Sequence, residues 1–340
     1  RRRERRGVLM SIATDARPYV AGVGLLTAGA LVAWLVGRAV PGLQPLVVAV
    51  VVGAAVSNTV GVPTTAEPGV GVHKLALETG IVLLGAAVAV DELVAAGPTV
   101  LGLVVCTVGF GLALSEAVAR VWFRLDGVAP SLLAAGASIC GVSAVVAIGR
   151  VLDARGATLT VAAATVLLFD AITLVAFPIA GEWLGLSGRT FGVWAGLSMF
   201  STGPVAAAGF AHSPEAGQWA TVTKLARNAL LGGVAIGYST LYAARSATDP
   251  EARRLWAEFP KFLIGFLLVA AVANAGVLSP AALAAIGTAS DGLFLVAFVG
   301  LGLSIRLREL ETVGLAPVGV VLVHLLVVSG LTLAAVRLLL

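Results

Sequence analysis

Long apolar runs separated by short polar stretches dominate the pattern of this chain. A helix needs roughly 17–25 predominantly apolar residues to cross the hydrocarbon core of a bilayer, and about eleven runs approach that length. The pattern therefore predicts an all-α, polytopic transmembrane helical bundle. The predicted spans cover residues 19–37, 44–60, 73–90, 97–119, 130–150, 157–181, 190–211, 216–242, 260–277, 281–304 and 312–338.

Composition points the same way, because 59% of the residues are hydrophobic, only 12% are charged and the mean hydropathy is +1.02. Soluble domains carry about 25% charged residues. Cys106 and Cys140 both lie inside apolar runs, so no structural disulfide is expected. No histidine pairs with a carboxylate in a metal or protease motif, and no phosphate-binding loop motif is present. We therefore expect neither an enzyme nor a cofactor.

The basic residues predict the orientation, since cytoplasmic loops of membrane proteins are rich in Lys and Arg. With the N-terminus in the cytoplasm and simple alternation, only Arg38, Arg150, Arg155 and Arg337 fall outside. The same rule explains the excess of basic residues without any nucleic-acid partner. The chain is thus expected to be a multi-pass protein of the cell (plasma) membrane with a cytoplasmic N-terminus.

Polar stretches suggest how the chain is organised. Residues 1–18 form a basic cytoplasmic segment, and residues 19–340 form a single transmembrane domain. Within that domain the polar stretch 246–258 separates a first block, residues 19–245, from a three-helix tail, residues 260–340.

Two weak internal similarities predict inverted repeats. Gly80–Leu93 resembles Gly292–Ile305, and the predicted spans that carry them run in opposite directions. Gly136–Gly149 resembles Gly196–Gly209, but simple alternation makes these two run in the same direction. The second pair is inverted only if one segment is re-entrant or a span has been missed. For both pairs, the alternative is a chance similarity between sequences rich in Ala, Val and Gly.

Small and hydroxylated residues gather at the centres of two predicted spans. They are Gly136, Ser138, Cys140, Gly141 and Ser143 in the first span, and Ser198, Ser201 and Thr202 in the second. Pro204, close behind, is expected to kink the second helix. Such clusters at membrane depth are typical of broken helices whose freed backbone groups hold a solute. The alternative is a seam where helices pack closely.

Ionisable residues inside predicted spans are costly and mark function by default. Lys224, Arg227 and Asn228 share one helical face, where two cations need a carboxylate or a bound anion between them, or else extend to an interface. Asp170 is the counter-ion of Arg227, a structural group or the site of a coupling ion, sodium or proton. His324, alone in an apolar span, is expected to be a packing residue.

These segments resemble a known family. Gly80–Gly85, Ala137–Ala147 and Lys224–Arg227 are similar to the prokaryotic family provisionally named sulfate exporters, multi-span proteins of largely unknown function. More distantly the chain resembles the bile acid/sodium symporters, which implies inverted repeats and two crossing broken helices. Where the resemblance leads us to expect Ser-Ile-His-Asp-Thr-Ala-Gln, residues 198–204 read Ser-Met-Phe-Ser-Thr-Gly-Pro, so an ionisable pair is missing.

The leading hypothesis is a secondary transporter, or exporter, that moves a small inorganic or organic anion by alternating access. Half-helix N-termini and serine and threonine hydroxyls would contact the solute, while Lys224 and Arg227 would supply positive charge. The alternatives are a sodium- or proton-coupled carrier that uses Asp170, and a non-transporting membrane scaffold. The expected partners are the solute and the lipid bilayer; whether the chain forms a homo-oligomer is left open.

Overall fold

A computed structural model describes residues 2–40, 44–88, 90–243, 261–306 and 314–340, and the regular elements in these ranges are all helical. Some of the helices are long and apolar enough to cross a membrane. These candidate spans are Tyr19–Ala39, Glu67–Ala87, Gly97–Trp122, Gly156–Trp183, Pro280–Leu303 and Leu315–Leu339. The polar stretch 246–258 lies outside the described residues.

The helices fall into two compact units. Unit 1 comprises residues 1–86 and 278–306. It contains α1 (Arg2–Ala39), α2 (Pro45–Thr59), α3 (Glu67–Val70), α4 (His73–Leu84) and α15 (Pro280–Leu303). Close approaches at glycines join these helices, because a Cβ on Gly302 would collide with the backbone of α2, and one on Gly300 with the His73 side chain. Ser290 also donates a hydrogen bond to the carbonyl of Gly80 at 2.9 Å.

Unit 2 comprises residues 87–277 and 307–340. Its elements up to α8 are α5 (Val90–Ala117), η2 (Val118–Trp122), α6 (Ala129–Ala135), η3 (Gly136–Cys140), α7 (Val142–Val151) and α8 (Gly156–Trp183). The elements after α8 are α9 (Gly188–Ser198), α10 (Thr202–His212), α11 (Pro214–Ala229), α12 (Leu231–Ala243), α14 (Phe262–Asn274) and α17 (Leu315–Leu339).

The segment α6–η3–α7 is a helical hairpin, here called hairpin 1 (residues 129–151). The chain reverses at Gly141, whose φ of 70° favours glycine because a Cβ is disfavoured there. The two arms lie side by side, since a Cβ on Gly136 would be 2.8 Å from the Val145 side chain. The root of α6 and the first turns of α8 line one cavity, so the hairpin enters beside the N-terminal end of α8.

The segment α9–α10 is a second helical hairpin, hairpin 2 (residues 188–212). Met199 and Ser201 are extended and reverse the chain between the arms. At the root, the rings of Phe191 and His212 stack with centroids 4.1 Å apart, and Gly181 packs against Phe191. Because Gly181 is near the last turn of α8, hairpin 2 enters beside the C-terminal end of that helix.

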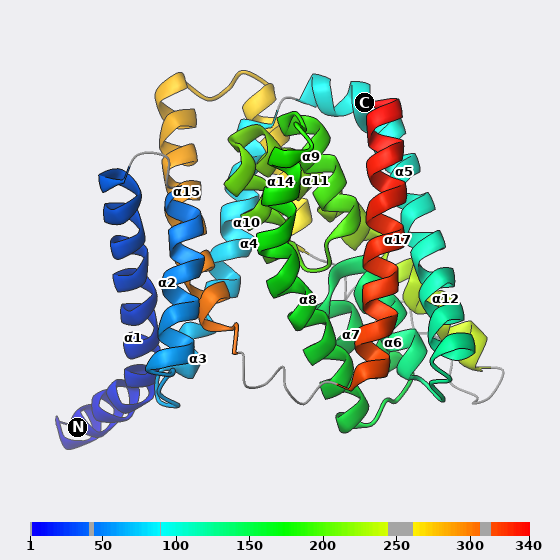
Figure 1. Cartoon of the computed structure of the whole chain (residues 1–340). Helices are drawn as coiled ribbons and strands as arrows, with labels where there is room; N and C mark the ends of the chain where they lie inside the picture. Colours follow the sequence, from blue (N-terminus) through cyan, green and yellow to red (C-terminus); the bar gives the residue numbers. More distant parts are fainter. Residues whose placement is uncertain (1, 41–43, 89, 244–260, 307–313) are drawn as a thin grey trace. The chain divides into compact units, whose positions relative to one another are not determined.

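These hairpins correct the reading of residues 130–150 and 190–211 as membrane spans. Each segment returns to the end of α8 from which it enters, and the two enter from opposite ends (Figure 1). Both predicted segments are therefore re-entrant, which removes the conflict over their direction; the internal repeats themselves stay a prediction. Pro204 kinks no helix, because it lies in the first turn of α10, where proline is tolerated.

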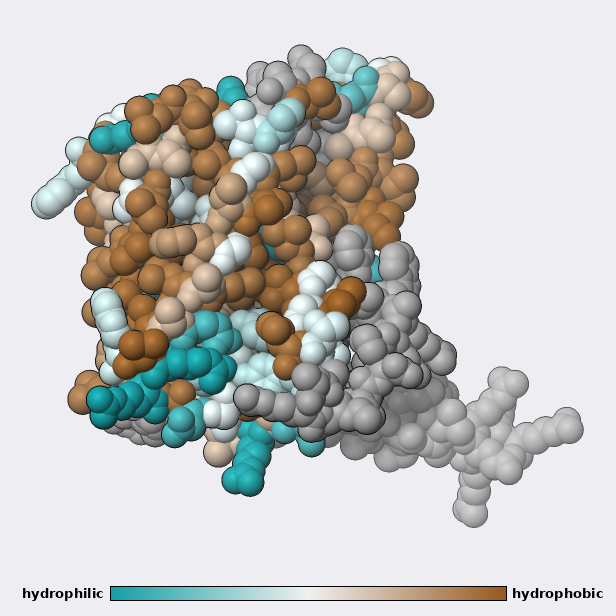
Figure 2. Space-filling view, turned by 90° about the vertical axis from the view of Figure 1, so that its right-hand side faces the viewer, coloured by the Kyte–Doolittle hydropathy of each residue, from teal (hydrophilic) through white to brown (hydrophobic). Residues whose placement is uncertain are grey.

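Large apolar side chains are exposed along the long helices, for example Leu101 and Val105 on α5 and Leu322 and Leu326 on α17. Figure 2 shows a face on which hydrophobic residues form most of the surface, while hydrophilic residues gather near its lower edge. This distribution is the one expected of helices that contact lipid.

Candidate functional site

The tips of the two hairpins meet beside the middle of α8. Gly141, at the tip of hairpin 1, lies so close to Ser201, at the tip of hairpin 2, that a Cβ on Gly141 would collide with the serine side chain. Phe169 of α8 and Phe200 of the second tip are both buried and lie edge to face, with ring centroids 6.1 Å apart. The resemblance implied two broken helices at a central site, and the structure brings the two breaks into contact.

Arg227 of α11 is fully buried and ties the two tips together. Its guanidinium donates to the carbonyls of Ala137 (3.2 Å) and Ser138 (2.8 and 3.2 Å) in hairpin 1. It also donates to the carbonyls of Gly196 and Met199 in hairpin 2, both at 2.8 Å. A guanidinium carries five N–H groups, so these five hydrogen bonds engage all of them.

Lys224, one helical turn before Arg227, makes the same kind of bridge. Its buried ammonium group donates to the carbonyl of Ile139 at 2.7 Å and to that of Met199 at 3.1 Å. The accepting carbonyls belong to the C-terminal ends of η3 and α9, where the helix dipole is negative and the last carbonyls have no intrahelical partner. Lys224 and Arg227 therefore complete both helix ends, and neither extends to a membrane interface.

Two polar side chains meet the start of α10. Oδ1 of the buried Asp170 accepts a hydrogen bond from the N–H of Ser201 at 2.9 Å. Asn228 donates through Nδ2 to the hydroxyl of Thr202 at 3.0 Å. Asp170 thus contacts the N-terminal end of a half-helix, which favours negative charge.

Buried polar atoms without a hydrogen-bond partner concentrate around the tips. Most buried polar groups in proteins have a partner, so such a concentration marks a place for water or a ligand. Of the eight such atoms among the described residues, five are on segments that form or face the tips: Ser138 Oγ, Asp170 Oδ2, Thr223 Oγ1, Asn228 Oδ1 and His324 Nε2. The other three are Ser57 Oγ, Arg189 Nε and His212 Nδ1.

The structure brings most of the predicted site residues together. Those at the tips are Gly136, Ser138, Cys140, Gly141, Ser201, Thr202, Asp170, Lys224, Arg227 and Asn228. Ser198 differs in that its hydroxyl bonds to Thr332 of α17 at 2.9 Å. Ser143, in the first turn of α7 directly after the tip, is exposed. Roles for these two residues in binding a solute stay predictions.

Sequence reasoning missed two contributors. Met199 gives its carbonyl to both Lys224 and Arg227, a role that no residue type reveals. His324 of α17 faces the tips: its Nδ1 is 2.8 Å from the hydroxyl of Ser115, and its ring lies 6.1 Å from that of Phe200. The one feature of the sequence that marks His324 is its isolation in an apolar span, a feature that also fits a packing residue.

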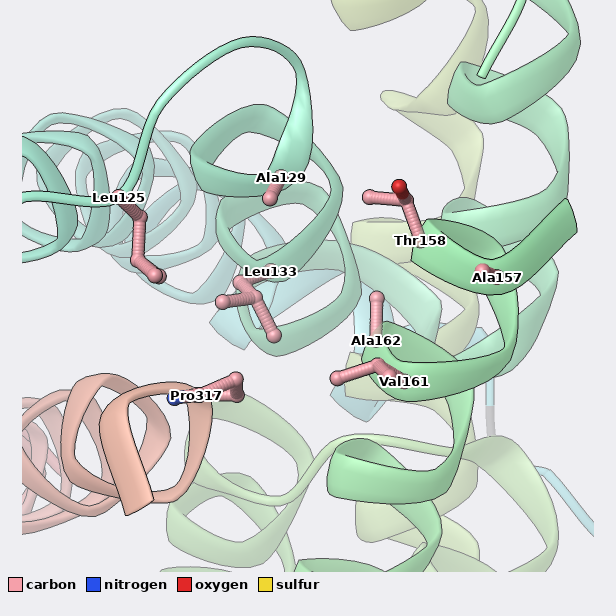
Figure 3. Close-up of a pocket in the computed structure, with 8 residues that line it drawn as sticks. All are labelled: Leu125, Ala129, Leu133, Ala157, Thr158, Val161, Ala162 and Pro317. Atoms are coloured by element: carbon pink, nitrogen blue, oxygen red, sulfur yellow. The ribbon is translucent and has the colours of Figure 1, made fainter. Parts of the chain in front are cut away.

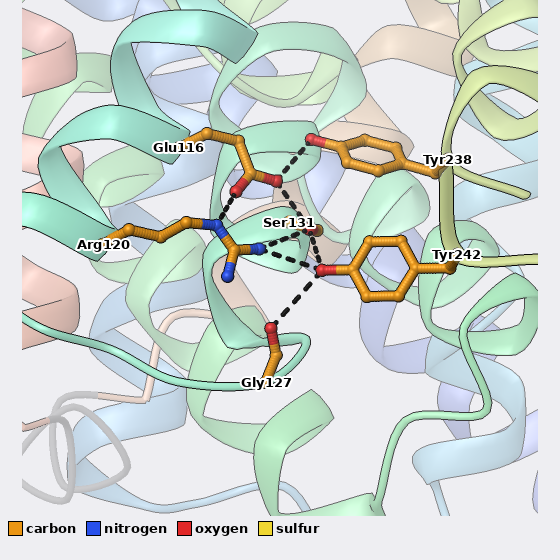
Figure 4. A network of polar contacts seen from close by, with 6 residues as sticks. All are labelled: Glu116, Arg120, Gly127, Ser131, Tyr238 and Tyr242. Carbon is orange, nitrogen blue, oxygen red and sulfur yellow. Dashed lines mark hydrogen bonds and ion pairs between the residues drawn. The ribbon is translucent and has the colours of Figure 1, made fainter. Parts of the chain in front are cut away.

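A polar network holds the root of hairpin 1 (Figure 4). The Glu116 carboxylate of α5 accepts from Arg120 Nε at 2.7 Å, from the Ser131 hydroxyl of α6 and from Tyr238 of α12 at 3.0 Å. Tyr242 of α12 accepts from Arg120 at 2.9 Å. The network therefore joins α6 to α5 and α12.

An apolar cavity of about 290 Å³ lies on the other face of the same arm (Figure 3). Ala129 and Leu133 of α6 line it, and each is two residues from Ser131, which places them on the opposite side of the helix. The other lining residues are Leu125, Ala157, Thr158, Val161, Ala162 and Pro317.

Comparison with known proteins places the chain in a family. Residues 21–321 match the family model described as conserved hypothetical protein 698. A UPF0324 membrane protein of Nitratidesulfovibrio vulgaris is 33% identical over 80% of this chain and 78% of its own length. Another, from Corynebacterium glutamicum, is 31% identical over 88% and 86%. The UPF0324 membrane protein TauZ of Paracoccus denitrificans is 32% identical over 83% and 84%.

No solved structure matches the chain. The likeness to the sulfate exporters and to the bile acid/sodium symporters therefore remains a resemblance of quoted segments. The match to the family model over most of the chain, together with the long apolar helices, gives a firmer conclusion: the chain is a multi-pass membrane protein that belongs to the conserved hypothetical protein 698 family, whose relatives are UPF0324 membrane proteins.

Proposed function

We propose that the chain is a secondary transporter that carries a small anion, inorganic or organic, past the meeting point of the two hairpin tips. The observation that carries the proposal is the surplus of positive charge buried there. Lys224 and Arg227 bring two formal positive charges and Asp170 at most one negative charge. An uncompensated charge away from water is costly, so a bound anion is the partner that completes this site.

The donors available to an anion come from hairpin 1 and α11. All five N–H groups of Arg227 are engaged by backbone carbonyls, so Arg227 supplies field and geometry, whereas the two hydrogen bonds of Lys224 leave one of its N–H groups for the solute. The N–H groups of Val142 and Ser143, the first two of α7, lie beside the tip and have no partner within their own helix, whereas those of Ala144 and Val145 bond to the carbonyl of Gly141. The unpartnered hydroxyls of Ser138 and Thr223 add two donors to this set.

The relation of the hairpins to α8 suggests how the site opens to each side. Arg120, Arg124, Arg150 and Arg155 lie at the end of α8 where hairpin 1 enters, and Arg189 and Arg337 at the other end. Simple alternation put Arg150 and Arg155 opposite Arg120 and Arg124, whereas the re-entrant hairpins put all four at one end of α8 and Arg189 at the other. By the positive-inside rule, hairpin 1 then reaches the tips from the cytoplasm and hairpin 2 from outside.

Coupling to a proton or a sodium ion at Asp170 is a second candidate that a separate observation favours. Oδ2 of Asp170 is buried and unpartnered, and Oδ1 of Asn228 is a further unpartnered acceptor on the facing helix. Unpartnered acceptor oxygens suit a proton or a hard cation. Such coupling is compatible with anion transport, because a cation bound at Asp170 adds positive charge to the site and so favours the binding of an anion.

Proteoliposomes that contain the purified protein test the proposal. Uptake or counterflow of radiolabelled sulfate, phosphate and acetate is measured with and without sodium and proton gradients. We expect one of these anions to be transported and to stabilise the protein thermally. Absence of both effects for every anion would contradict the proposal.

Variants separate anion binding from coupling. Ser138→Ala removes a proposed donor with little change in volume and should weaken transport while the protein stays folded. Asp170→Asn should abolish the dependence on a sodium or proton gradient and retain counterflow of the anion. Loss of both activities in Asp170→Asn, in a protein of unchanged thermal stability, would place the anion itself at Asp170.

A further inference from the structure

Among the described residues, His324 is the one histidine whose side chain faces both hairpin tips. The ring is 1% exposed, within contact range of Phe200 in hairpin 2, and beside Ser138 in hairpin 1. Gly111 of α5 permits the approach to Ser138. A Cβ on Gly111 would lie 2.8 Å from Cε1 of His324 and 2.9 Å from the Ser138 hydroxyl.

The surroundings of the imidazole indicate which nitrogen carries the proton. Ser115 of α5 lies 2.8 Å from Nδ1, and a hydroxyl can donate to that nitrogen. The backbone carbonyls of Gly111 and Ala137 lie near the ring, but neither is within hydrogen-bond geometry of Nε2. This environment fits a neutral ring with its hydrogen on Nε2.

Nε2 of His324 has no hydrogen-bond partner, and neither has the neighbouring Ser138 hydroxyl. Two unpartnered donors, both buried and both next to the same tip, form a matched pair for the oxygen atoms of an anion. We propose that His324 binds the transported oxyanion through Nε2–H together with the hydroxyl of Ser138, and that Ser115 positions the ring. This inference rests on the proposed function and assigns His324 to the solute rather than to packing.

The test uses the 340-residue chain in proteoliposomes and in detergent, with radiolabelled sulfate as the probe, or phosphate or acetate if that anion stabilises the wild type more. His324→Leu removes the donor, and His324→Gln keeps an N–H near the position of Nε2. A hydrogen bond to a charged group corresponds to a change in affinity of about tenfold to a hundredfold. We expect His324→Leu to weaken anion binding by this factor and His324→Gln to recover part of it.

Two further variants distinguish binding from packing. Ser115→Ala should weaken binding less than His324→Leu, because it frees the ring without removing the donor. Ser329→Ala, on the same helix but away from the tips, should leave binding unchanged. Equal affinity in wild type, His324→Leu and His324→Gln, all folded by thermal unfolding, would overturn the role of His324 alone. A wild type that binds none of the three anions would overturn the proposed function, and this inference with it.

Discussion

Hairpins 1 and 2 meet at the same place but are held by different kinds of contact. Hairpin 2 lies against α11 through its glycines: a Cβ on Gly192 would be 2.6 Å from the carbonyl oxygen of Ala216, and one on Gly209 would be 3.0 Å from the same oxygen. Gly136 and Gly149 of hairpin 1 instead face side chains of valine and leucine. Backbone cannot yield without moving a helix, whereas side chains can change rotamer.

The arm α6 of hairpin 1 is further distinguished by what flanks it. One face borders the apolar cavity, and the other is tied by the Ser131 hydroxyl to the network around Glu116. A segment next to empty space has fewer contacts to lose when it moves. The comparison teaches that hairpin 2 is the fixed half of the site and hairpin 1 the less constrained half. Four experiments test this picture of the site.

The largest effect is expected for Arg227→Gln, because this side chain holds both tips. The substitution leaves several buried carbonyls without a donor, at a cost of about 1–3 kcal/mol for each unsatisfied group. We expect the free energy of unfolding in detergent, measured by denaturant titration, to fall by at least that amount, and transport to be lost. Arg227→Lys should be nearly as damaging, since an ammonium cannot reproduce five hydrogen bonds in the geometry of a guanidinium. An unfolding free energy like that of wild type would show that the carbonyls find other partners.

Gly192→Ala and Gly136→Ala add the same methyl group to the two hairpins. Overpacking in a buried place costs about 1–3 kcal/mol. We expect the upper end of this range for Gly192→Ala, which meets the backbone of α11, and the lower end for Gly136→Ala, which meets side chains of Val145 and Val166. Thermal unfolding of both variants gives the comparison, and the reverse order of stability would contradict it.

Ala162→Leu and Ala216→Leu form a matched pair of larger substitutions. Ala162 borders the cavity beside hairpin 1, whereas the carbonyl of Ala216 lies against Gly192 and its side chain is fully buried. Filling a cavity can stabilise a protein by about 0.5–2 kcal/mol. We therefore expect Ala162→Leu to raise the melting temperature slightly and Ala216→Leu to lower it. A similar loss of stability in both would mean that the cavity cannot accept a side chain.

Ser131→Ala should have the smallest effect on stability, about 1 kcal/mol, because the three partners of Ser131, which are Glu116, Arg120 and Tyr242, keep other hydrogen bonds in the network in Figure 4. Its more informative readout is amide hydrogen exchange. We expect α6 to exchange faster than α9 in the wild type, and the difference to increase in Ser131→Ala. Faster exchange confined to α9 would reverse the assignment of the two hairpins.

Hydropathy predicted the helical membrane fold well and the number of crossings less well. The segments 130–150 and 190–211 have the length and apolarity of spans. Length and apolarity do not distinguish a segment that crosses the membrane from one that turns back halfway. The reversal at Gly141 depends on one backbone angle, and the reversal at Met199–Ser201 on extended residues without a distinctive side chain. The sequence indicated the difference only indirectly: the two segments resemble each other, yet simple alternation of spans makes them run in the same direction, which an inverted repeat does not allow.

For the site, residue types alone identified the cation pair on α11, the small-residue tips and Asp170 as candidates. They did not identify what Lys224 and Arg227 bind, because backbone carbonyls are the same for every residue type. The alternatives for Arg227 included a carboxylate, a bound anion and an interface. The structure pairs its side chain with the carbonyls at two helix ends and places Asp170 on the N–H of Ser201.

The sequence by itself therefore determined that this chain is a helical membrane protein with glycine- and serine-rich breaks and ionisable groups at membrane depth. These properties follow from local composition and from the cost of burying charge. Tertiary structure alone decided that both breaks are hairpin tips, that they meet, and that His324 faces them. Such contacts join residues far apart in the chain, and they depend on backbone direction and close packing, for which no local pattern of side chains is sufficient.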